Sequence, residues 1–347
     1  MNLHFVVPDG IDDPARPSGG NAYDVRARDG LGAAGWDVRV HPVAGSWPQP
    51  DAAAHTALTD VVERIPNGAV VLLDGLVAST APEVLVPQAR RLRLVALVHM
   101  PLGQGPEANG SRTREGAVLE AAAAVVTTSG WARRTVLDLY ALPDDRVHVA
   151  EPGADAVALA PGTATADALL SVGAVIPAKG HDVLVDALGT VAGMPWSCVC
   201  VGSVERDPAF AADLRQRVAD GALDGRVSFP GPCTGAELAT AYAAADLLVV
   251  PSRAESYGMV VTEALGRGLP VIATDVGGVA EVVRDGENGL LVSPQDPQAL
   301  ADALRRVLSD AAVAERLAAG AAASADTWVA TSEEYAARLE ALVAGLR

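Results

Sequence analysis

The stretch from Pro251 to Val292 reads PSRAESYGMVVTEALGRGLPVIATDVGGVAEVVRDGENGLLV, and it decides the fold class of this chain. Just before it, the apolar run Leu247 to Val250 is typical of a buried strand, and Ala254 to Gly258 forms the loop that follows. Met259 to Leu265 has helical composition and ends at Gly266. A buried strand, a loop and a helix in this order are the repeating unit of an open parallel sheet.

Two carboxylates, Glu255 and Glu263, stand eight residues apart in this stretch. The first falls on the strand-exit loop and the second on the following helix. Ligands bind at that edge of an open parallel sheet, and the N–H groups of a helix start favour an anion there. Such a site suits a ligand with both a phosphate and sugar hydroxyls. From the spacing alone, two solvated acids at a helix end are an equally good interpretation.

Three further elements follow the two glutamates: an apolar strand from Pro270 to Thr274, the glycines Gly277 and Gly278, and a turn that contains Asp285, Gly286, Asn288 and Gly289. In this order, the segment closely resembles the E-x7-E donor signature of retaining glycosyltransferases of the family-4 type. The resemblance implies that Glu255 faces the transferred sugar and that Glu263 holds the ribose hydroxyls of a nucleotide.

Apolar runs of strand length alternate with alanine-rich helical stretches along the whole chain. The predicted strands are Leu3–Val7, Val38–Val40, Val70–Leu73, Leu94–Val98, Val125–Thr127 and Val147–Val149, then Leu170–Gly173, Cys198–Val201, Val227–Phe229, Leu247–Val250, Val271–Ala273 and Leu290–Val292. This alternation predicts α/β layers with parallel strands. The pattern restarts after a Pro- and Ala-rich linker from Pro152 to Ala168.

We therefore expect the GT-B architecture, in which two doubly wound Rossmann-like domains face each other across a cleft. The chain has 347 residues, enough for two domains at roughly 150 residues each. The expected divisions are an acceptor-binding domain over residues 1–160, a nucleotide-sugar-binding domain over 161–327, and a C-terminal helix over 328–347 that crosses back onto the first domain.

Composition and charge restrict the partners. The formal net charge of −17 argues against nucleic acid, which needs clustered cations, and disfavours stable association with an anionic membrane. No apolar stretch approaches the ~18 residues of a membrane span, and the start MNLHFVVPDG lacks the basic region of a signal peptide. Cys198, Cys200 and Cys233 fit neither a disulfide framework nor a zinc site. These features predict a cytoplasmic protein.

Lys179 is the only lysine in the chain. Where arginine serves at every other position, a compact ammonium indicates a phosphate clamp, although chance in an arginine-rich composition is an alternative. Lys179 also matches the K-G of the family's diphosphate-binding loop. Many relatives add an arginine after the V-G dipeptide, where this chain has Ala174. Backbone N–H groups at Gly258 or the side chain of Arg253 are candidates to replace it, and weak donor binding is the third possibility.

In the first domain, Gly19 and Gly20 lie in PSGGN at a predicted strand-to-helix turn, where a backbone without side chains can approach a diphosphate. His99 closes the strand Leu94 to Val98, and the family has a histidine at this place that is suited to bind the sugar. A structural histidine and a glycine-dependent turn are the alternatives. Ser129 resembles a strand-exit serine of the family.

The resemblance thus implies a catalytic set and a donor-binding set. The catalytic set is His99, Lys179 and Glu255. The donor-binding set comprises Gly19, Gly20, Lys179, Gly202, Pro232, Cys233, Ser256, Tyr257, Gly258, Met259, Val260 and Glu263. The loops 103–116 and 46–54 are expected to line the acceptor pocket, with Arg112 and Arg114 holding an acidic group or lying on the solvated surface.

The expected reaction is metal-independent transfer of a sugar from a nucleoside diphosphate donor, preferably UDP-linked, to a hydroxyl of a soluble small molecule, with no cofactor. No D-x-D pair occurs in the sequence, so the metal-bridged diphosphate site of the other large glycosyltransferase fold has no obvious ligands. Retention follows from the resemblance, and because Glu263 is expected on the nucleotide, we favour same-face attack over double displacement.

Other functions fit parts of the pattern. A dinucleotide-dependent dehydrogenase requires G-x-G-x-x-G after its first strand, which the segment around Gly19 does not supply. A nucleotide-sugar epimerase and a sugar phosphorylase are consistent with the same fold. A sugar-nucleotide-binding partner without catalysis is consistent with the missing arginine.

Overall fold

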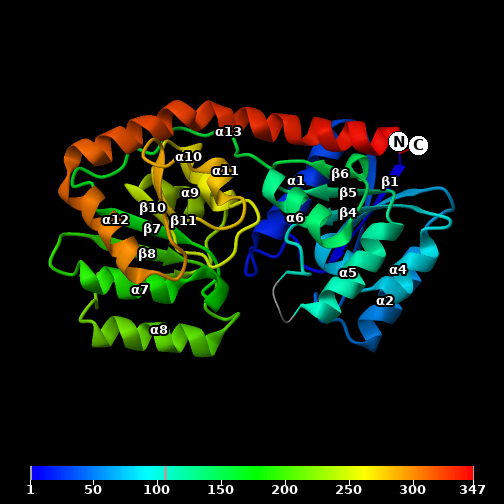
Figure 1. The fold of residues 1–347 in the computed structure, drawn as a ribbon, viewed down its shortest axis with the longest axis horizontal. Helices are drawn as coiled ribbons and strands as arrows, with labels where there is room; N and C mark the ends of the chain where they lie inside the picture. The colour runs from blue at the N-terminus through cyan, green and yellow to red at the C-terminus, as the bar shows by residue number, and fades with distance from the viewer. Residues whose placement is uncertain (1, 105–107, 347) are drawn as a thin grey trace. The chain divides into compact units, whose positions relative to one another are not determined.

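The computed structural model describes residues 2–104 and 108–346 (Figure 1). The chain divides into two compact units. The first comprises Met1–Asp12, Gly20–Pro152 and Glu333–Arg347, and the second comprises Asp13–Gly19 and Gly153–Ser332. Over the described residues, no helix is long and apolar enough to cross a membrane.

The first unit is built on a six-stranded parallel sheet with the order β2-β1-β3-β4-β5-β6. Its strands are β1 (Asn2–Pro8), β2 (Asp37–Val43), β3 (Val70–Asp74), β4 (Arg93–Val98), β5 (Ala124–Thr127) and β6 (Val147–Val149). The helices that connect them are α1 (Gly19–Ala33), α2 (Ala52–Glu63), α3 (Gly75–Ala78), α4 (Pro82–Gln88), α5 (Asn109–Ala121) and α6 (Gly130–Tyr140), with a short 3-10 turn at Asp144–Arg146.

The second unit repeats this plan with the strand order β12-β11-β10-β7-β8-β9, again all parallel. Its strands are β7 (Ala168–Val172), β8 (Ser197–Val201), β9 (Val227–Gly231), β10 (Leu247–Val250), β11 (Val271–Thr274) and β12 (Gly289–Val292). Its helices are α7 (His181–Thr190), α8 (Pro208–Asp220), α9 (Gly235–Ala243), α10 (Met259–Leu265), α11 (Val279–Val282) and α12 (Pro297–Ser309), and a 3-10 turn spans Pro177–Lys179.

Strand β10 shows why its sequence is apolar at every position. Leu247 and Val249 belong to the core that α7, α8 and α12 cover, while Leu248 and Val250 belong to the core under α9, α10 and α11. Figure 1 shows these two sets of helices on opposite faces of the sheet. Successive side chains of a strand point to opposite faces, so a strand buried on both faces has no polar position.

The α/β fold class and all twelve predicted strands are confirmed, with strand ends that differ by a few residues. The helix predicted between Met259 and Leu265 is also confirmed. Three local expectations were wrong. Gly19 and Gly20 are the first residues of α1 and do not lie in the turn before it, and residues 52–54 and 109–116 are helical and not irregular loops.

The segment predicted as a linker has no helix or strand between residues 153 and 167, but it is bonded to the second unit. The carboxylate of Asp246 accepts from Thr163 N at 2.6 Å and from Ala168 N at 2.9 Å. The amide of Ala160 donates to Arg267 O at 2.7 Å. These contacts explain why residues 153–160 group with the second unit, whereas we expected the division after residue 160.

The last helix, α13 (Ala311–Gly345), starts 17 residues before the predicted start at Trp328 and contributes to both units. In the first unit, Tyr335 is 2% exposed and packs edge-on against Tyr23, with ring centroids 4.9 Å apart. Its hydroxyl donates to the carbonyl of Tyr23 at 3.2 Å. The end of the chain is therefore part of the core of the first unit.

We predict that Tyr335→Ala lowers the free energy of unfolding by about 3–5 kcal/mol, because it leaves a ring-sized cavity. Tyr335→Phe keeps the ring and removes only one hydrogen bond, so about 1 kcal/mol is expected. Urea unfolding of the intact chain, monitored by circular dichroism, measures both. Equal losses for the two variants would contradict this packing.

Candidate functional site

Each sheet has one topological switch point, where the strand order reverses. In the first sheet it lies between β1 and β3, and in the second it lies between β7 and β10. In doubly wound sheets, ligands bind beyond the carboxyl ends of the strands at such a point. Lys179 follows β7, most of the other residues predicted for the donor site follow β10, and His99 directly follows β4.

The loops after β7 and β10 touch through a glycine. Gly180 has φ +69°, and a Cβ at this position would lie 2.0 Å from the carbonyl oxygen of Pro251. Only glycine fits such a close approach in the left-handed region of backbone space. The amide of Arg253 also donates to Ala178 O at 2.8 Å. The backbone therefore fixes where Lys179, at the end of the 3-10 turn, stands relative to the β10 loop.

Lys179 and Glu255 form an ion pair at this contact. The ammonium Nζ lies 2.5 Å from Glu255 Oε1, and Ser252 Oγ donates to the same oxygen at 2.9 Å. The Lys179 side chain is 31% exposed and that of Glu255 is 10% exposed. The structure thus brings together two of the three residues predicted to be catalytic, and leaves the cation accessible to a ligand.

Gly277 and Gly278, the glycines that follow β11, contact the backbone of Glu255. The amide of Gly278 donates to Glu255 O at 3.1 Å. Gly277 has φ +60°, and a Cβ there would lie 1.6 Å from the same carbonyl oxygen. Glycine is therefore required at residue 277, because the β11 loop crosses directly over the backbone of Glu255.

Glu263 lies on α10 and is partly buried. Its Oε2 accepts from the hydroxyl of Tyr242 at 2.9 Å, and the guanidinium of Arg267 stands 4.6 Å from the centre of the Tyr242 ring. Burial, followed by the nearby Glu263 carboxylate, raises the pKa of Tyr242, so the phenol stays a donor. This contact fixes the orientation of the Glu263 carboxylate.

The remaining residues predicted for the donor site on this loop differ in access. Gly258, with φ +89°, caps α10, which has only seven residues. Ser256, Met259 and Val260 are partly buried, whereas Tyr257 is 3% exposed and belongs to the core. So short a helix offers a weak dipole, which leaves Lys179 as the main positive charge of this loop cluster.

Arg253, a candidate to replace the missing arginine, has another partner. Its guanidinium forms two hydrogen bonds to the carboxylate of Asp182, at 2.9 and 2.7 Å, and also donates to Pro177 O. Burial raises the pKa of Asp182, but the bonds from Arg253 outweigh it and lower that pKa below its usual value. Since its charge is matched by Asp182, Arg253 serves to join the two loops.

The loops after β7, β8 and β9 meet without side chains. A Cβ on Gly202 would lie 1.9 Å from Gly173 O, and the Gly202 amide donates to Gly231 O at 2.9 Å. A Cβ on Gly173 would press against the aliphatic stem of Lys179 at 3.4 Å. Pro232 and Cys233 directly follow Gly231. Pro232 is exposed and Cys233 is partly buried. This edge offers mainly backbone groups to a ligand.

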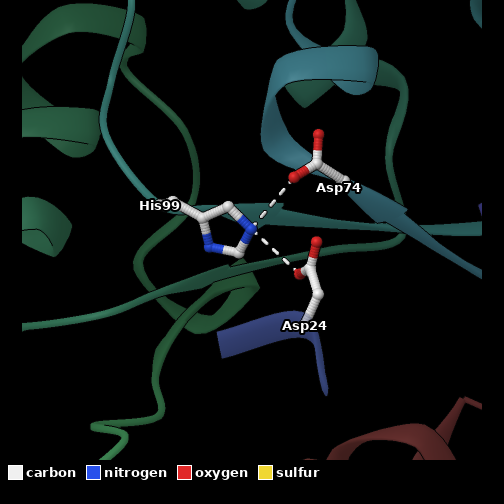
Figure 2. Close-up of side chains that lie close together, drawn as sticks. All are labelled: Asp24, Asp74 and His99. Carbon is white, nitrogen blue, oxygen red and sulfur yellow. Dashed lines mark hydrogen bonds and ion pairs between the residues drawn. The ribbon is translucent and has the colours of Figure 1, made fainter. Parts of the chain in front are cut away.

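In the first unit, His99 is held by two carboxylates that the sequence analysis did not select (Figure 2). Its Nε2 lies 2.9 Å from Asp24 Oδ1 and 3.1 Å from Asp74 Oδ2. Asp24, on α1, is 0% exposed, and Asp74, the last residue of β3, is 3% exposed. The sequence offered two signals for these acids: Asp74 directly follows a predicted strand, and Asp24 comes shortly after the Gly19–Gly20 pair.

Burial lowers the pKa of His99, but the charge of Asp24 and the hydrogen bonds to both acids outweigh it and raise the pKa to about 10. Burial also raises the pKa of Asp24, to about 7, although the charge of His99 opposes this. This raised pKa favours an imidazolium at neutral pH, a protonation state that the sequence does not specify.

A third acid missed by the sequence analysis, Glu115, organises the segment after His99. Glu115 is 0% exposed and accepts from the amides of Leu102 and Gly103 at 3.1 and 2.9 Å, and from Ser79 Oγ at 2.7 Å. The hydroxyl of Tyr140 also donates to it. Four donors satisfy one buried carboxylate, which anchors the chain just past His99.

The other predicted residues of the first unit have local structural partners. Arg112 Nε donates to Gly103 O at 2.9 Å, and Arg114 forms two bonds with Glu83, at 2.6 and 2.8 Å. Ser129 caps α6 by accepting from Ala132 N at 3.0 Å. Gly19, predicted for the first domain, groups with the second unit, and a Cβ there would make only an ordinary contact, so sterics do not require glycine. The acceptor role of the arginines stays a prediction.

Comparison with known proteins gives consistent results. Residues 166–310 match the family described as glycosyl transferases group 1. A D-inositol 3-phosphate glycosyltransferase from Jonesia denitrificans is 35% identical over 261 residues, which cover 69% of this chain and 61% of the relative. The enzyme of the same name from Nocardioides sp. is 37% identical over 246 residues, 63% of this chain and 53% of the relative. This chain thus spans less than two thirds of these relatives.

Solved structures share the fold over nearly the whole chain. Sucrose-phosphate synthase from Thermosynechococcus elongatus has a TM-score of 0.79 at 25% identity, covering 99% of this chain and all (100%) of that chain. The Anabaena protein HepE, in complex with UDP and glucose, has a TM-score of 0.78 at 20% identity, covering 98% of this chain and 100% of that chain. These likenesses confirm the GT-B fold class.

We predict opposite effects for two alanine substitutions in and beside α7. Gly180→Ala forces a Cβ against Pro251 O at positive φ, and should lower stability by about 1–3 kcal/mol. Gly189→Ala, in the same helix with nothing within 4 Å of the new Cβ, should stabilise by about 0.5–1 kcal/mol. Thermal unfolding of the two variants measures the difference. A stable Gly180→Ala protein would argue against the close approach of the two loops.

Proposed function

We propose that this chain, whose residues 166–310 belong to the glycosyl transferases group 1 family, transfers a sugar from a nucleoside diphosphate donor to a hydroxyl of an acceptor molecule. The observation that carries the proposal is the Lys179–Glu255 pair at the switch point of the second sheet. An accessible ammonium stands there beside a carboxylate, at an edge where glycines leave the backbone open.

In this proposal, Lys179 binds the diphosphate. The Lys179 side chain is 31% exposed, and Oε1 of its partner Glu255 also accepts from the hydroxyl of Ser252. An incoming diphosphate adds negative charge on the exposed side, so the lysine can bind it without leaving a buried acid unpaired. The ammonium then stabilises the charge that develops on the departing phosphate, which lowers the barrier by about 3 kcal/mol.

Glu263 is proposed to bind the ribose. Its carboxylate is oriented by the Tyr242 hydroxyl and retains acceptor capacity for the two ribose hydroxyls. The base would rest against the loops at Gly202 and at Pro232 and Cys233. These loops offer mainly backbone groups, which carry little information about the base. UDP is therefore proposed from the UDP bound in the structurally similar HepE and not from a residue of this chain.

The proposed reaction retains the configuration of the sugar and needs no metal at the diphosphate. The acceptor hydroxyl attacks the anomeric carbon from the face that the diphosphate leaves, the bond to the phosphate oxygen breaks, and that oxygen takes the hydroxyl proton. Lys179 compensates the charge on the leaving group, and Glu255 and His99 orient the sugar. The absence of a D-x-D pair in the sequence supports this route.

The acceptor is proposed to be a small hydroxylated molecule. Relatives of the chain are named as D-inositol 3-phosphate glycosyltransferases, and a structural neighbour is a sucrose-phosphate synthase, which favours phosphorylated polyols and sugars as the first acceptors to test. Arg112 and Arg114 are the predicted partners of an acidic group. Arg114 would have to exchange Glu83 for it, since the two form a pair 2.6 Å apart.

We predict that Lys179→Ala abolishes transfer and weakens UDP binding roughly 10- to 100-fold, as expected for the loss of a charge-assisted hydrogen bond. Glu263→Ala should abolish transfer as well, through loss of the ribose contacts. Isothermal titration with UDP, ADP and GDP identifies the base, and mass spectrometry with acceptor pools measures transfer.

The matched controls are Arg215→Ala and Glu237→Ala, which remove a cation and an acid from exposed positions of the same unit and should change neither property. Full activity of a folded Lys179→Ala or Glu263→Ala protein would refute the proposed site. Donor turnover with phosphate, or without any acceptor, would instead support a phosphorylase or an epimerase, and nucleotide binding without turnover a non-catalytic partner.

A further inference from the structure

We propose that Asp24 and Asp74 are positioning residues that hold the His99 ring by its Nε2–H group, keep it as an imidazolium, and leave Nδ1–H as the donor to a ligand oxygen. The role of His99 at the sugar rests on the proposed function. The assembly of the three side chains is independent of it, and we refer to them as the triad.

The triad is built at the switch point of the first sheet. Asp24 comes from α1, Asp74 closes β3, and His99 directly follows β4. Figure 2 shows Nε2 directed between the two carboxylates, with Nδ1 on the opposite side of the ring. The ring is also packed edge-on against Tyr23, with centroids 4.9 Å apart. Three neighbouring elements therefore fix one imidazole in one orientation.

The two carboxylates have unequal support. Asp74 Oδ1 accepts from the amides of Leu76 and Val77 at 2.8 and 3.1 Å, which leaves Oδ2 for His99. Asp24 has no such donors: both of its oxygens are fully buried and lack an aligned hydrogen-bond partner, although Nε2 is 2.9 Å away. A single N–H bond cannot align with both acids at once. The burial of the Asp24 carboxylate is therefore offset either by the charge of the imidazolium or by a proton on the carboxylate itself.

Charge balance leads to the same conclusion. Two ionised carboxylates and one imidazolium carry a net charge of −1, which is costly where the side chains are 1%, 4% and 12% exposed. One additional proton, on Asp24, makes the triad neutral. Burial is the largest of the causes that raise the pKa of Asp24 to about 7, and this pKa agrees with such a proton at neutral pH.

The free nitrogen indicates where a ligand is bound. His99 Nδ1 is buried and has no hydrogen-bond partner. In an imidazolium this atom carries a hydrogen, and an unpaired buried N–H is costly. A ligand oxygen that accepts from Nδ1 removes this cost. The same atom argues against a metal bound at Nε2, because the second nitrogen of a metal-binding histidine almost always donates to a protein group.

The consequence for the proposed reaction is that His99 acts as a charged donor and not as a base. The groups whose charges act on the ring are Asp24 from α1 and Asp74 from β3, beside the uncharged ring of Tyr23. Because the pKa of His99 is raised from 6.5 to about 10, the stabilisation that the protonated His99 contributes is complete below pH 6.5 and is lost as the pH rises through about 10.

The test is a histidine-selective NMR titration of the full chain, with His99 assigned through a His99→Gln variant. We expect imidazolium signals of His99 from pH 6 to 8. Asp24→Asn should lower its titration midpoint by at least one pH unit. Asp74→Asn keeps the oxygen that caps α3 but offers an amide to Nε2, so it should move the ring toward the neutral form with a proton on Nδ1.

The other five histidines, His4, His41, His55, His148 and His181, are internal controls and should not move in either variant. A midpoint near 6.5 for His99 in the unsubstituted protein would overturn the proposal. So would retention of one Zn²⁺ or Mn²⁺ per chain after dialysis that Asp24→Asn abolishes, because a metal at Nε2 displaces its proton.

A kinetic readout separates the triad from the proposed function. If transfer is confirmed, the unsubstituted enzyme should keep a constant kcat from pH 6 to 8, while kcat of Asp24→Asn should fall as the pH rises, with little change in KM for the donor. An unchanged pH profile in a folded Asp24→Asn enzyme would contradict the positioning role. If NMR confirms the triad but UDP, ADP and GDP all fail to bind, the proposed function fails and the triad stands.

Discussion

The close approach of two loops at Gly180 and Pro251 is the constraint on which the second unit depends. A carbonyl oxygen occupies the place where any other residue would carry its Cβ, so the chain after β7 can lie directly on the chain after β10. Because these strands are neighbours on either side of the switch point, residues 76 positions apart in sequence meet as Lys179 and Glu255. The ion pair is the result of that backbone contact, since a pair of this exposure contributes little stability by itself. A similar contact occurs in the loop after β11, where the carbonyl oxygen of Glu255 occupies the place that a Cβ of residue 277 would take.

The sequence predicted the fold well because the central strands of both sheets are buried on both faces. Such strands are mainly apolar and appear as apolar runs bounded by loops, and all twelve strands were identifiable although the edge strands β2 and β9 are partly exposed. Helix ends were less predictable. The start of α13 at Ala311 was missed although Asp310 caps it by accepting from Ala312 N at 3.0 Å, because the alanine-rich composition that follows does not separate one helix from two. The turn before α1 was misplaced for a related reason, since glycine is common both in turns and at helix starts, and Gly19 takes the second role.

The site of the second unit was more predictable than that of the first. Lys179, Glu255 and Glu263 lie in segments with several fixed features, and a unique lysine is visible without any structure. Asp24, Asp74 and Glu115 carry no such mark, because each is one acid among 43 aspartates and glutamates. Their importance comes from burial, which only tertiary structure decides. An exposed acid is solvated wherever it lies, but an acid at 0% exposure must have its charge matched by donors or a cation.

Burial also explains why the two charged clusters suit different tasks. The Lys179 side chain is 31% exposed, so its ammonium is partly solvated. It can exchange its ion pair with Glu255 for one with an incoming anion at a small cost in free energy. His99 is 12% exposed between acids at 1% and 4%, so its charge is fixed by its surroundings and cannot move away from them. A mobile cation suits the capture and release of a diphosphate, whereas a fixed one suits the orientation of a neutral group through a single N–H bond. The fixed cation is built from groups whose proton affinities depend on each other, and for this reason replacing a single carboxylate is expected to change the protonation of the whole triad.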